Sequence, residues 1–309
     1  MTDRPARLTS ARMASPFAYL PHRAILSLTG PDTITLLERL VTHETANWAP
    51  GITRYGALLT PQGKVLADYL AIRTSDGVLM DVATSEIETL AKRLKLFRLR
   101  AAVEIEILSD VFVVAGLEDA PDGIRPISGA DHVYLDPRYA GGRLRGLATK
   151  ESWAAWYGYH PAEWSQTVDA YHTDRIAACV PEQGSDFGPA ELFPADINMD
   201  LLGGVALKKG CFVGQEVVSR MHRRGKIRKR TFRVDLAAGG MASVGDEILA
   251  PTPIGVISSA EGRHALAQIR VDRWQTAQRS DAAVLLNDSV ITIVEPDWLA
   301  AELTPMDRA

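Results

Sequence analysis

The hydrophobic pattern of the chain changes once, near residue 232, and this change limits the folds that the chain can adopt. Before that point, segments with helical periodicity and segments with strand periodicity follow one another without a regular strand–helix–strand rhythm. From Thr231 onward the apolar runs are short and are separated by Gly and Asp, which is typical of a small β-barrel or sandwich. The pattern therefore predicts an α+β protein with a C-terminal β domain over residues 232–309.

The first part of the chain, residues 21–231, is expected to form a separate mixed region. Its predicted strands cover residues 24–29, 56–60, 65–73, 78–82, 103–107 and 111–115. A helix is predicted from Gly30 through Thr42, and the sequence Ser85-Glu86-Ile87-Glu88 predicts a capping box that starts a second helix with a basic last turn. Residues 1–20 are expected to be a loose N-terminal tail.

Composition excludes several classes of protein. The formal net charge of −4 argues against general nucleic-acid binding, so any basic function must be local. Two cysteines cannot form a disulfide framework, which favours a reducing compartment. The sequence contains no run of 18 apolar residues, which a membrane span would need. The N-terminus also lacks the apolar core of a signal peptide. We expect a bacterial cytoplasmic protein, with the mitochondrial matrix as the alternative. No zinc motif such as HExxH or Cys-x-x-Cys occurs, so no metal site is expected.

The sequence KKGCFVGQE, residues 208–216, places Cys211 in a polar setting. Gly210 and Gly214 allow a sharp turn, and a helix is predicted from Gln215 to Met221. A thiol near a helix N-terminus and near cations has a lowered pKa, which favours the reactive thiolate. The alternative is an inert packed thiol.

The cations that could act on this thiol are Lys208, Lys209 and Arg220. A stable iron–sulfur cluster normally takes four cysteine ligands, and Cys179 is the one other cysteine in the chain. Cys211 could therefore bind a cluster only transiently or share it with a partner protein.

A basic run, Arg220 to Arg230, contains seven Lys/Arg and no acid. It can be interpreted as a solvated basic face or as a site for phosphate, a polyglutamate tail or RNA.

The sequence KKGCFVGQEVVSR resembles the signature of the YgfZ-type family. These are folate-binding proteins implicated in iron–sulfur protein maturation, and they are related to the aminomethyltransferase (T-protein) of the glycine cleavage system. Further stretches resemble the family in the same order, among them LLTPQGKVLADYLAIR, RIAACVP and IGVISSAEGRHALAQIR. The resemblance covers most of residues 20 to 272. It implies a ring-like fold of three lobes, two of them interwoven and the third a barrel, around a channel that binds tetrahydrofolate or a one-carbon derivative.

The resemblance also implies folate contacts. Asp68 falls where T-proteins have an aspartate near the reactive folate nitrogen, and Tyr171 and Arg23 match positions of folate-contacting tryptophans in bacterial relatives. Ala177 stands where T-proteins have a pterin-binding glutamate. Cys179 stands where the family usually has glycine and is expected to be structural.

Three functions follow as hypotheses. The first is a tetrahydrofolate-binding factor that assists iron–sulfur cluster assembly or repair in client or carrier proteins. In it Cys211 is the functional thiol, and Lys209, Gln215, Glu216 and Arg220 shape its surroundings. The second is a folate-dependent aminomethyl or one-carbon transferase with Asp68 as its acid–base residue; the absence of the glutamate at Ala177 counts against it. The third is an accessory protein in tRNA modification that uses the basic run.

Overall fold

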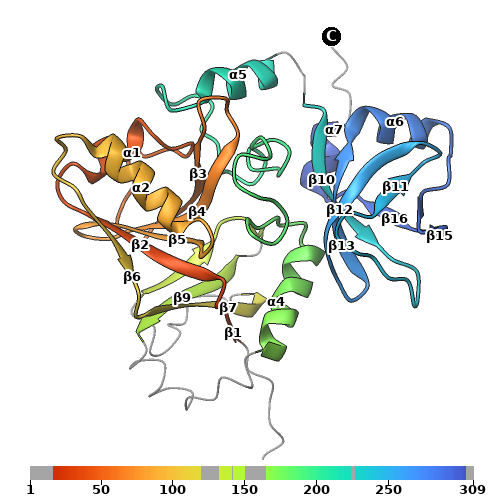
Figure 1. Cartoon of the computed structure of the whole chain (residues 1–309), viewed down its shortest axis with the longest axis horizontal. Coiled ribbons are helices and arrows are strands. Elements are labelled where there is room, and N and C mark those ends of the chain that lie inside the picture. Colours follow the sequence, from red (N-terminus) through yellow and green to blue (C-terminus); the bar gives the residue numbers. More distant parts are fainter. Residues whose placement is uncertain (1–16, 120–131, 141, 150–164, 224–226, 304–309) are drawn as a thin grey trace, which may run out of the picture.

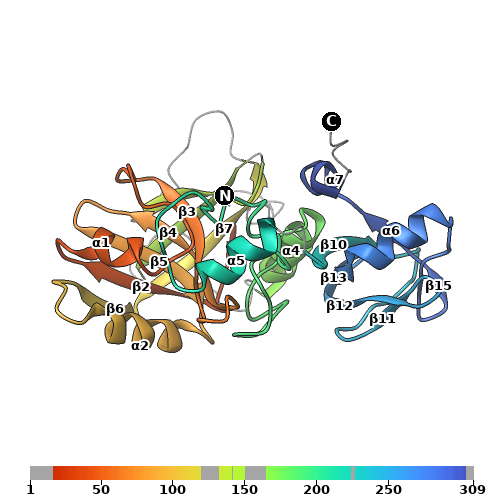
Figure 2. The ribbon, with the colours of Figure 1, turned by 90° about the horizontal axis from the view of Figure 1, so that it is seen from above.

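The computed structural model describes residues 17–119, 132–140, 142–149, 165–223 and 227–303. These residues form three lobes (Figure 1). Two mixed lobes lie against each other, and a β-barrel stands beside them. Figure 2 shows α4 and α5 lying between the barrel and the first lobe. The structure confirms the expected α+β class with a C-terminal barrel.

Lobe 1 is a five-stranded sheet in the order β3-β4-β5-β2-β6 with two helices on one face. Its strands are β2 (Arg23–Thr29), β3 (Thr53–Leu59), β4 (Val65–Arg73), β5 (Gly77–Ala83) and β6 (Glu104–Leu108). Its helices are α1 (Thr33–Glu38) and α2 (Ile87–Arg98). Alternate side chains divide between the two faces of the sheet. On β2, Leu26 and Leu28 face the helices, while Ile25 belongs to the core shared with lobe 2.

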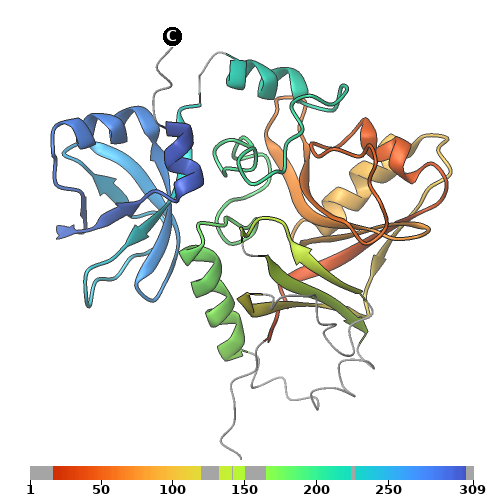
Figure 3. The same ribbon diagram turned by 180° about the vertical axis from the view of Figure 1, so that it is seen from behind.

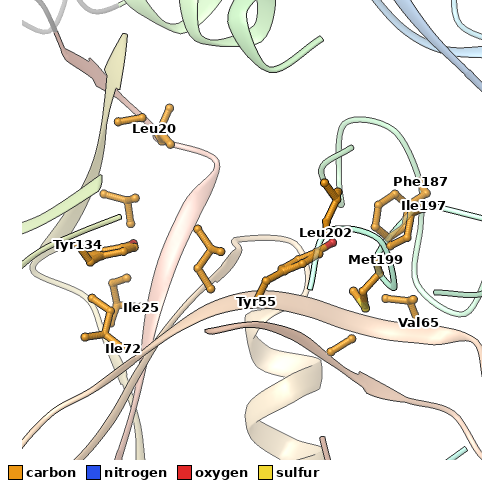
Figure 4. Packing of buried hydrophobic residues seen from close by; sticks show 14 of the residues in the cluster. Leu20, Ile25, Tyr55, Val65, Ile72, Tyr134, Phe187, Ile197, Met199 and Leu202 are labelled. Carbon is orange, nitrogen blue, oxygen red and sulfur yellow. The ribbon is translucent and has the colours of Figure 1, made fainter. Parts of the chain in front are cut away.

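Lobe 2 is a four-stranded sheet in the order β1-β7-β9-β8, followed by helix α4 (Ser165–Ala177). Its strands are β1 (Phe17–Tyr19), β7 (Val111–Asp119), β8 (His132–Asp136) and β9 (Arg143–Thr149). Tyr134 of β8 belongs to one core with Ile25 and Ile72 of lobe 1 (Figure 4). Because both faces of the lobe 1 sheet are covered, strand β4 is almost continuously buried.

A central segment, residues 178–214, connects α4 to helix α5 (Gln215–Arg223). It contains turns and an isolated bridge between Gln183 and Phe187. Seen from behind, it passes between lobe 1 and the barrel (Figure 3). The segment is held by apolar contacts to lobe 1, where Phe187, Met199 and Leu202 belong to one core with Tyr55 and Val65 (Figure 4).

The barrel is a seven-stranded antiparallel sheet in the order β15-β14-β11-β12-β13-β10-β16. Its strands are β10 (Lys229–Asp235), β11 (Glu247–Leu249), β12 (Pro253–Glu261), β13 (His264–Arg270), β14 (Leu285–Leu286), β15 (Ser289–Val290) and β16 (Thr292–Val294). Helices α6 (Val271–Arg279) and α7 (Asp297–Leu303) contribute Trp274 and Leu299 to its core.

The barrel is joined to the central segment by hydrogen bonds to main-chain carbonyls. Asn198 Nδ2 donates to Thr231 O at 2.7 Å, and Gln268 Nε2 donates to Asp196 O at 3.0 Å.

The predicted strands of lobe 1 are confirmed within a few residues, but two local predictions are wrong. Helix α1 ends at Glu38 rather than Thr42, because Val41 forms a bridge with Leu58 and the chain has already turned toward the sheet. No capping box forms, since the N-cap of α2 is Glu86 and makes no side-chain capping hydrogen bond.

Strand β1 lies within the segment expected as a tail, and residues 1–16 lie outside the described residues. So does the stretch 150–164, which carries three of the tryptophans of the chain.

Candidate functional site

Cys211 is exposed in the loop that precedes α5. It lines an open pocket of about 590 Å³ together with residues of the helix. Gln215, Ser219 and His222 line this pocket together with Phe212, and their spacing places them on one helix face. Cys179, in contrast, is completely buried, and burial raises the pKa of its thiol to about 12. The two cysteines therefore differ in chemistry: one is available at the surface and the other is inert.

The loop of Cys211 is held against lobe 1 by two glycines. Gly214 has a φ of +79°, and a Cβ at this residue would lie 2.7 Å from the carbonyl oxygen of Thr60. Gly63 has a φ of +80°, and its Cα would lie 3.0 Å from the same Cβ. The β3–β4 turn and the start of α5 can thus approach closely only because both residues lack a side chain. Gly210 is different, since the nearest atom to a Cβ there is 4.0 Å away.

Lys209 anchors the other end of the loop. Its ammonium donates to Val41 O at 2.9 Å and to His43 O at 2.8 Å, and it lies 3.8 Å from Glu38 Oε2. The side chain is 1% exposed, and burial lowers the pKa of the amine. Since its hydrogens are directed at carbonyls of lobe 1, Lys209 fixes the loop rather than facing the thiol.

The remaining motif residues also make bonds within the loop and helix. Gln215 Nε2 donates to Lys209 O at 3.2 Å, which closes the loop on itself. Glu216 and Arg220 form an ion pair one turn apart on α5, and both side chains are more than half exposed. An exposed pair of this kind contributes little to stability. The motif as a whole therefore builds a fixed loop that presents one free thiol.

The basic run does not form one surface. Arg230 is buried and pairs with Asp200, with Nη1–Oδ1 at 2.5 Å and Nη2–Oδ2 at 2.9 Å. Arg220 is paired on α5, and Arg223 hydrogen-bonds to Ser219 O of the same helix. Residues 224–226 lie outside the described residues.

The three expected folate contacts come together at a second place, where lobes 1 and 2 meet the central segment. Arg23 Nε lies 2.6 Å from Asp81 Oδ1, and Arg23 Nη1 lies 3.2 Å from Glu182 Oε1. The hydroxyl of Tyr171 accepts from Arg145 Nη2 at 2.6 Å and donates to Glu182 Oε2 at 3.0 Å. Burial by itself favours the protonated acid, but His22 and Arg23 hold the pKa of Glu182 well below its usual value.

Asp68 lies beside this cluster and is 1% exposed. Tyr55 donates to its Oδ2 at 3.0 Å, while its Oδ1 has no hydrogen-bond partner in the described chain. Burial raises the pKa of Asp68 to about 6, although Arg23 and Arg138 oppose this shift. A buried carboxylic acid with a free oxygen is the kind of group that could bind a polar edge of a ligand.

A pterin does not fit this cluster as it is packed. Arg23, Asp68 and Tyr171 are at most 6% exposed, and the polar groups of Arg23 and Tyr171 are directed at protein partners. A folate ring could stack there only if these side chains separated, which would leave buried charges without partners. Ala177 also offers no acid, and its carbonyl accepts from Arg233 Nη1 at 2.9 Å.

Sequence reasoning missed the partners of both sites. Glu38 and His43 hold Lys209, and Arg145 and Glu182 close the cluster around Tyr171. These residues are 11 to 171 positions from the groups that they bond, and no spacing rule joins them. No group of three or more His, Cys, Asp or Glu suited to a metal ion occurs among the described residues. None of the described helices has the length and apolar character that a membrane span requires.

Comparison with known structures defines the class of the fold. The glycine cleavage system aminomethyltransferase T from Bartonella henselae superimposes with a TM-score of 0.71, at 14% identity, over 92% of this chain and 85% of that one. The family described as "CAF17, C-terminal beta-barrel domain" matches residues 228–301. The chain is thus a protein of the aminomethyltransferase-type fold with a CAF17-type barrel.

Comparison of sequences shows which proteins of known name the chain is similar to. The chain is 32% identical to the mitochondrial iron–sulfur cluster assembly factor IBA57 homolog of Mycosarcoma maydis, over 69% of this chain and 55% of the relative. It is 32% identical to human IBA57, over 70% and 65% of the two chains, and 27% identical to the mouse protein, over 90% and 84%. The sequence is thus similar to proteins named as iron–sulfur cluster assembly factors of the IBA57 type.

The matches cover only part of the length of these relatives, and the names of the relatives contradict the predicted location. The chain spans 55% to 65% of the length of the first relatives that it matches. The names of these relatives state that they are mitochondrial, which contradicts the expected bacterial cytoplasmic location. The cytoplasmic prediction is wrong on this evidence, because it was based on the lack of a signal core, a feature that a mitochondrial protein also lacks.

Proposed function

We propose that this chain assists the assembly of iron–sulfur clusters and that Cys211 is its functional thiol. The observation that carries the proposal is the contrast within the motif: the side chain of Lys209 is fixed to lobe 1 and Gln215 closes the loop, while the thiol of Cys211 is left exposed. A loop built in this way positions one ligand at the surface. The names of the related assembly factors support the same class of function.

One thiolate supplies one of the ligands that a cluster needs, so the others must come from a partner that carries the cluster. In the proposed step the Cys211 thiolate binds an iron of the incoming cluster and replaces one thiolate of the carrier. The proton lost by Cys211 passes to the displaced thiolate, and no electrons are transferred. The cluster is the cargo of this reaction, and partners are iron–sulfur carrier and client proteins.

The test compares Cys211→Ser with Cys179→Gly in a transfer assay. A carrier protein loaded with a [2Fe–2S] cluster is mixed with an apo-enzyme that needs a cluster, and recovery of enzyme activity is followed with and without this chain. Cys179→Gly is the matched control, because Cys179 is buried and has a φ of +57°, which glycine adopts without strain. We expect Cys211→Ser to lose the stimulation and Cys179→Gly to keep it. Full stimulation by Cys211→Ser would refute the proposal.

Tetrahydrofolate binding is a second candidate, and the free Oδ1 of Asp68 is the observation that favours it. Asp68 could bind a polar edge of the pterin if the side chains of the cluster moved apart. The test is the thermal unfolding midpoint with excess tetrahydrofolate, since a ligand that binds the native state raises it. A shift that is lost in Asp68→Asn would support folate binding. No shift at millimolar ligand would remove folate and leave the role of Cys211 untouched.

Two other functions have less support. A one-carbon transferase would use Asp68 as its acid–base residue, and formation of methylene-tetrahydrofolate from an aminomethyl carrier is its test. A role in tRNA modification would use the basic run, and its test is RNA binding that weakens steeply with salt. The burial of Arg230 removes one of the cations on which that role depends.

A further inference from the structure

A groove on lobe 1, at the end of α2, has no part in either site described above. It has a volume of about 690 Å³, and we call it the Leu99 groove. It is lined by the buried Leu36 of α1, by Leu99 and by three arginines, Arg39, Arg98 and Arg100. One acid, Asp32, also lines it, and its Oδ2 accepts from Ala102 N at 2.8 Å. The groove therefore combines an apolar base with cations.

Leu99 is held in an unfavourable position. Its backbone has a φ of 50° and a ψ of −107°, and its side chain is 83% exposed. Helices commonly end with glycine at a residue of positive φ, because a Cβ is costly there. Leu96, one turn earlier, is 63% exposed. Two exposed leucines, one on a strained backbone, gain nothing from packing within this chain, so a contact outside the chain accounts for them better.

The cations around the groove are also in excess. Residues 92–100 contain five Lys/Arg and no acid, although the whole chain has a net charge of −4. Favourable interaction with the helix dipole explains cations within the last turn of α2, but Arg100 lies beyond the helix and Arg39 follows α1. Arg39 and Arg100 are exposed and form no ion pair with the described residues. The groove thus presents positive charge that an acidic partner would neutralise.

The groove and the loop of Cys211 both contact the end of α1. Arg39 lines the groove, and the preceding residue, Glu38, pairs with Lys209. Lys209 is two residues before the thiol. The end of α1 thus borders the groove through Arg39 and holds the Cys211 loop through Glu38, and Figure 1 shows α5 at the edge of the lobe that carries α1 and α2.

We propose that the Leu99 groove docks an acidic, amphipathic segment of the protein that brings the cluster to Cys211. Its apolar side chains contact Leu96, Leu99 and Leu36, and its carboxylates pair with Arg39 and Arg100. The combination of leucines with spaced cations favours a protein segment over RNA, which would gain from stacking aromatic side chains that this groove lacks among its lining residues. This proposal rests on the proposed function, because it names the surface that the cluster carrier uses.

The test measures binding of an acidic iron–sulfur carrier protein, loaded with a [2Fe–2S] cluster, to three forms of this chain. Leu99→Gly is the sharpest variant, because glycine relieves the strained φ while removing the docking side chain. We expect a higher unfolding midpoint together with at least tenfold weaker binding. The double variant Arg39→Glu/Arg100→Glu should also weaken binding at least tenfold and should reduce its dependence on salt.

Matched controls lie on the barrel. Met241→Ser removes a side chain that is 85% exposed, and Arg279→Glu reverses an exposed arginine at the end of α6; neither should change binding. Cys211→Ser should still bind the carrier but should lose the change in the cluster circular dichroism spectrum that a new ligand causes. In the groove variants, Cys211 should react with iodoacetamide at the same rate as in the wild type, which would show that the loop of Cys211 is unchanged.

The outcomes separate the two proposals. Binding within threefold of wild type for both groove variants would overturn the docking surface and leave the role of Cys211 intact. Failure of the wild type to bind the loaded carrier would overturn it as well. Binding that depends on the groove but brings no spectral change in the wild type would keep the surface and refute the thiol.

Discussion

Gly214 lies close to the β3–β4 turn, so a side chain at this residue should lower the stability in two ways. It would be strained by the left-handed backbone, and it would collide with the turn. Gly214→Ala places a Cβ on a backbone with a φ of +79° and 2.7 Å from the Thr60 carbonyl oxygen. Gly203→Ala is the matched control, because its φ is +76° and no atom lies within 4 Å of the new Cβ. Both variants share the backbone cost, and only Gly214→Ala adds the collision.

The magnitudes follow from these contacts. A left-handed conformation costs a residue with a Cβ about 1–2 kcal/mol. Insertion of a methyl group into a tightly packed place costs about 1–3 kcal/mol more, and here the opposing atoms are backbone atoms that cannot rotate away. We therefore expect Gly203→Ala to lower the free energy of unfolding by about 1–2 kcal/mol and Gly214→Ala to lower it by about 2–5 kcal/mol.

The assay is equilibrium unfolding in urea, followed by tryptophan fluorescence, with iodoacetamide labelling of Cys211 as a second readout. A displaced α5 should change the labelling rate in Gly214→Ala and not in Gly203→Ala. Equal losses of stability, within about 0.5 kcal/mol, and unchanged labelling would refute the view that the glycine motif serves to dock the cysteine loop.

Three further predictions concern buried polar groups and thiols. Lys209→Met should lower the free energy of unfolding by about 3 kcal/mol in urea denaturation, because it leaves two buried carbonyls without their charged donor, and a loss below about 1 kcal/mol would contradict this. The folded pKa of Asp68, about 6 against an ordinary 3.8, means that its ionisation opposes folding. Stability from this group is present in full below pH 3.8 and is lost as the pH rises through 6, so Asp68→Asn should gain up to about 3 kcal/mol at pH 7 and almost nothing at pH 4. A pH-independent difference in unfolding curves would count against that shift. Iodoacetamide at pH 8 should modify one thiol, Cys211, in the native protein and both thiols in urea; mass spectrometry that found native Cys179 labelled would disprove its burial.

Local patterns predicted the elements of this fold well, since each strand of lobe 1 is set by its own alternation of apolar residues. The pattern of short apolar runs predicted the C-terminal β domain, whereas the arrangement in three lobes was predicted from a family resemblance. The end of α1 was missed because a single bridge, between Val41 and Leu58, overrides the helical pattern. The capping box failed for a similar reason, as Ser85 has the right type but Glu86 occupies the cap.

The candidate site was predicted only in part, and the reason is the distance along the chain. Cys211 and Gly214 could be selected because their chemistry is visible in the residue itself. Lys209 was expected to act on the thiol, but its role depends on the carbonyls of Val41 and His43, more than 160 residues away. Main-chain carbonyls have no signature in a sequence. The same holds for Tyr171, whose hydroxyl is held by Arg145 and Glu182 rather than left free to stack on a ligand.

The buried cluster around Arg23 has a consequence for how the molecule unfolds. Asp81 belongs to lobe 1, Arg145 to lobe 2 and Glu182 to the central segment, and each of them shares charge with a residue of another unit. If one unit opened alone, it would leave an ion without its counter-ion inside a region that water does not reach. We therefore expect an intermediate with a single open lobe to be disfavoured. Lobes 1 and 2 are separate sheets in space, but we expect them to unfold together as one cooperative unit.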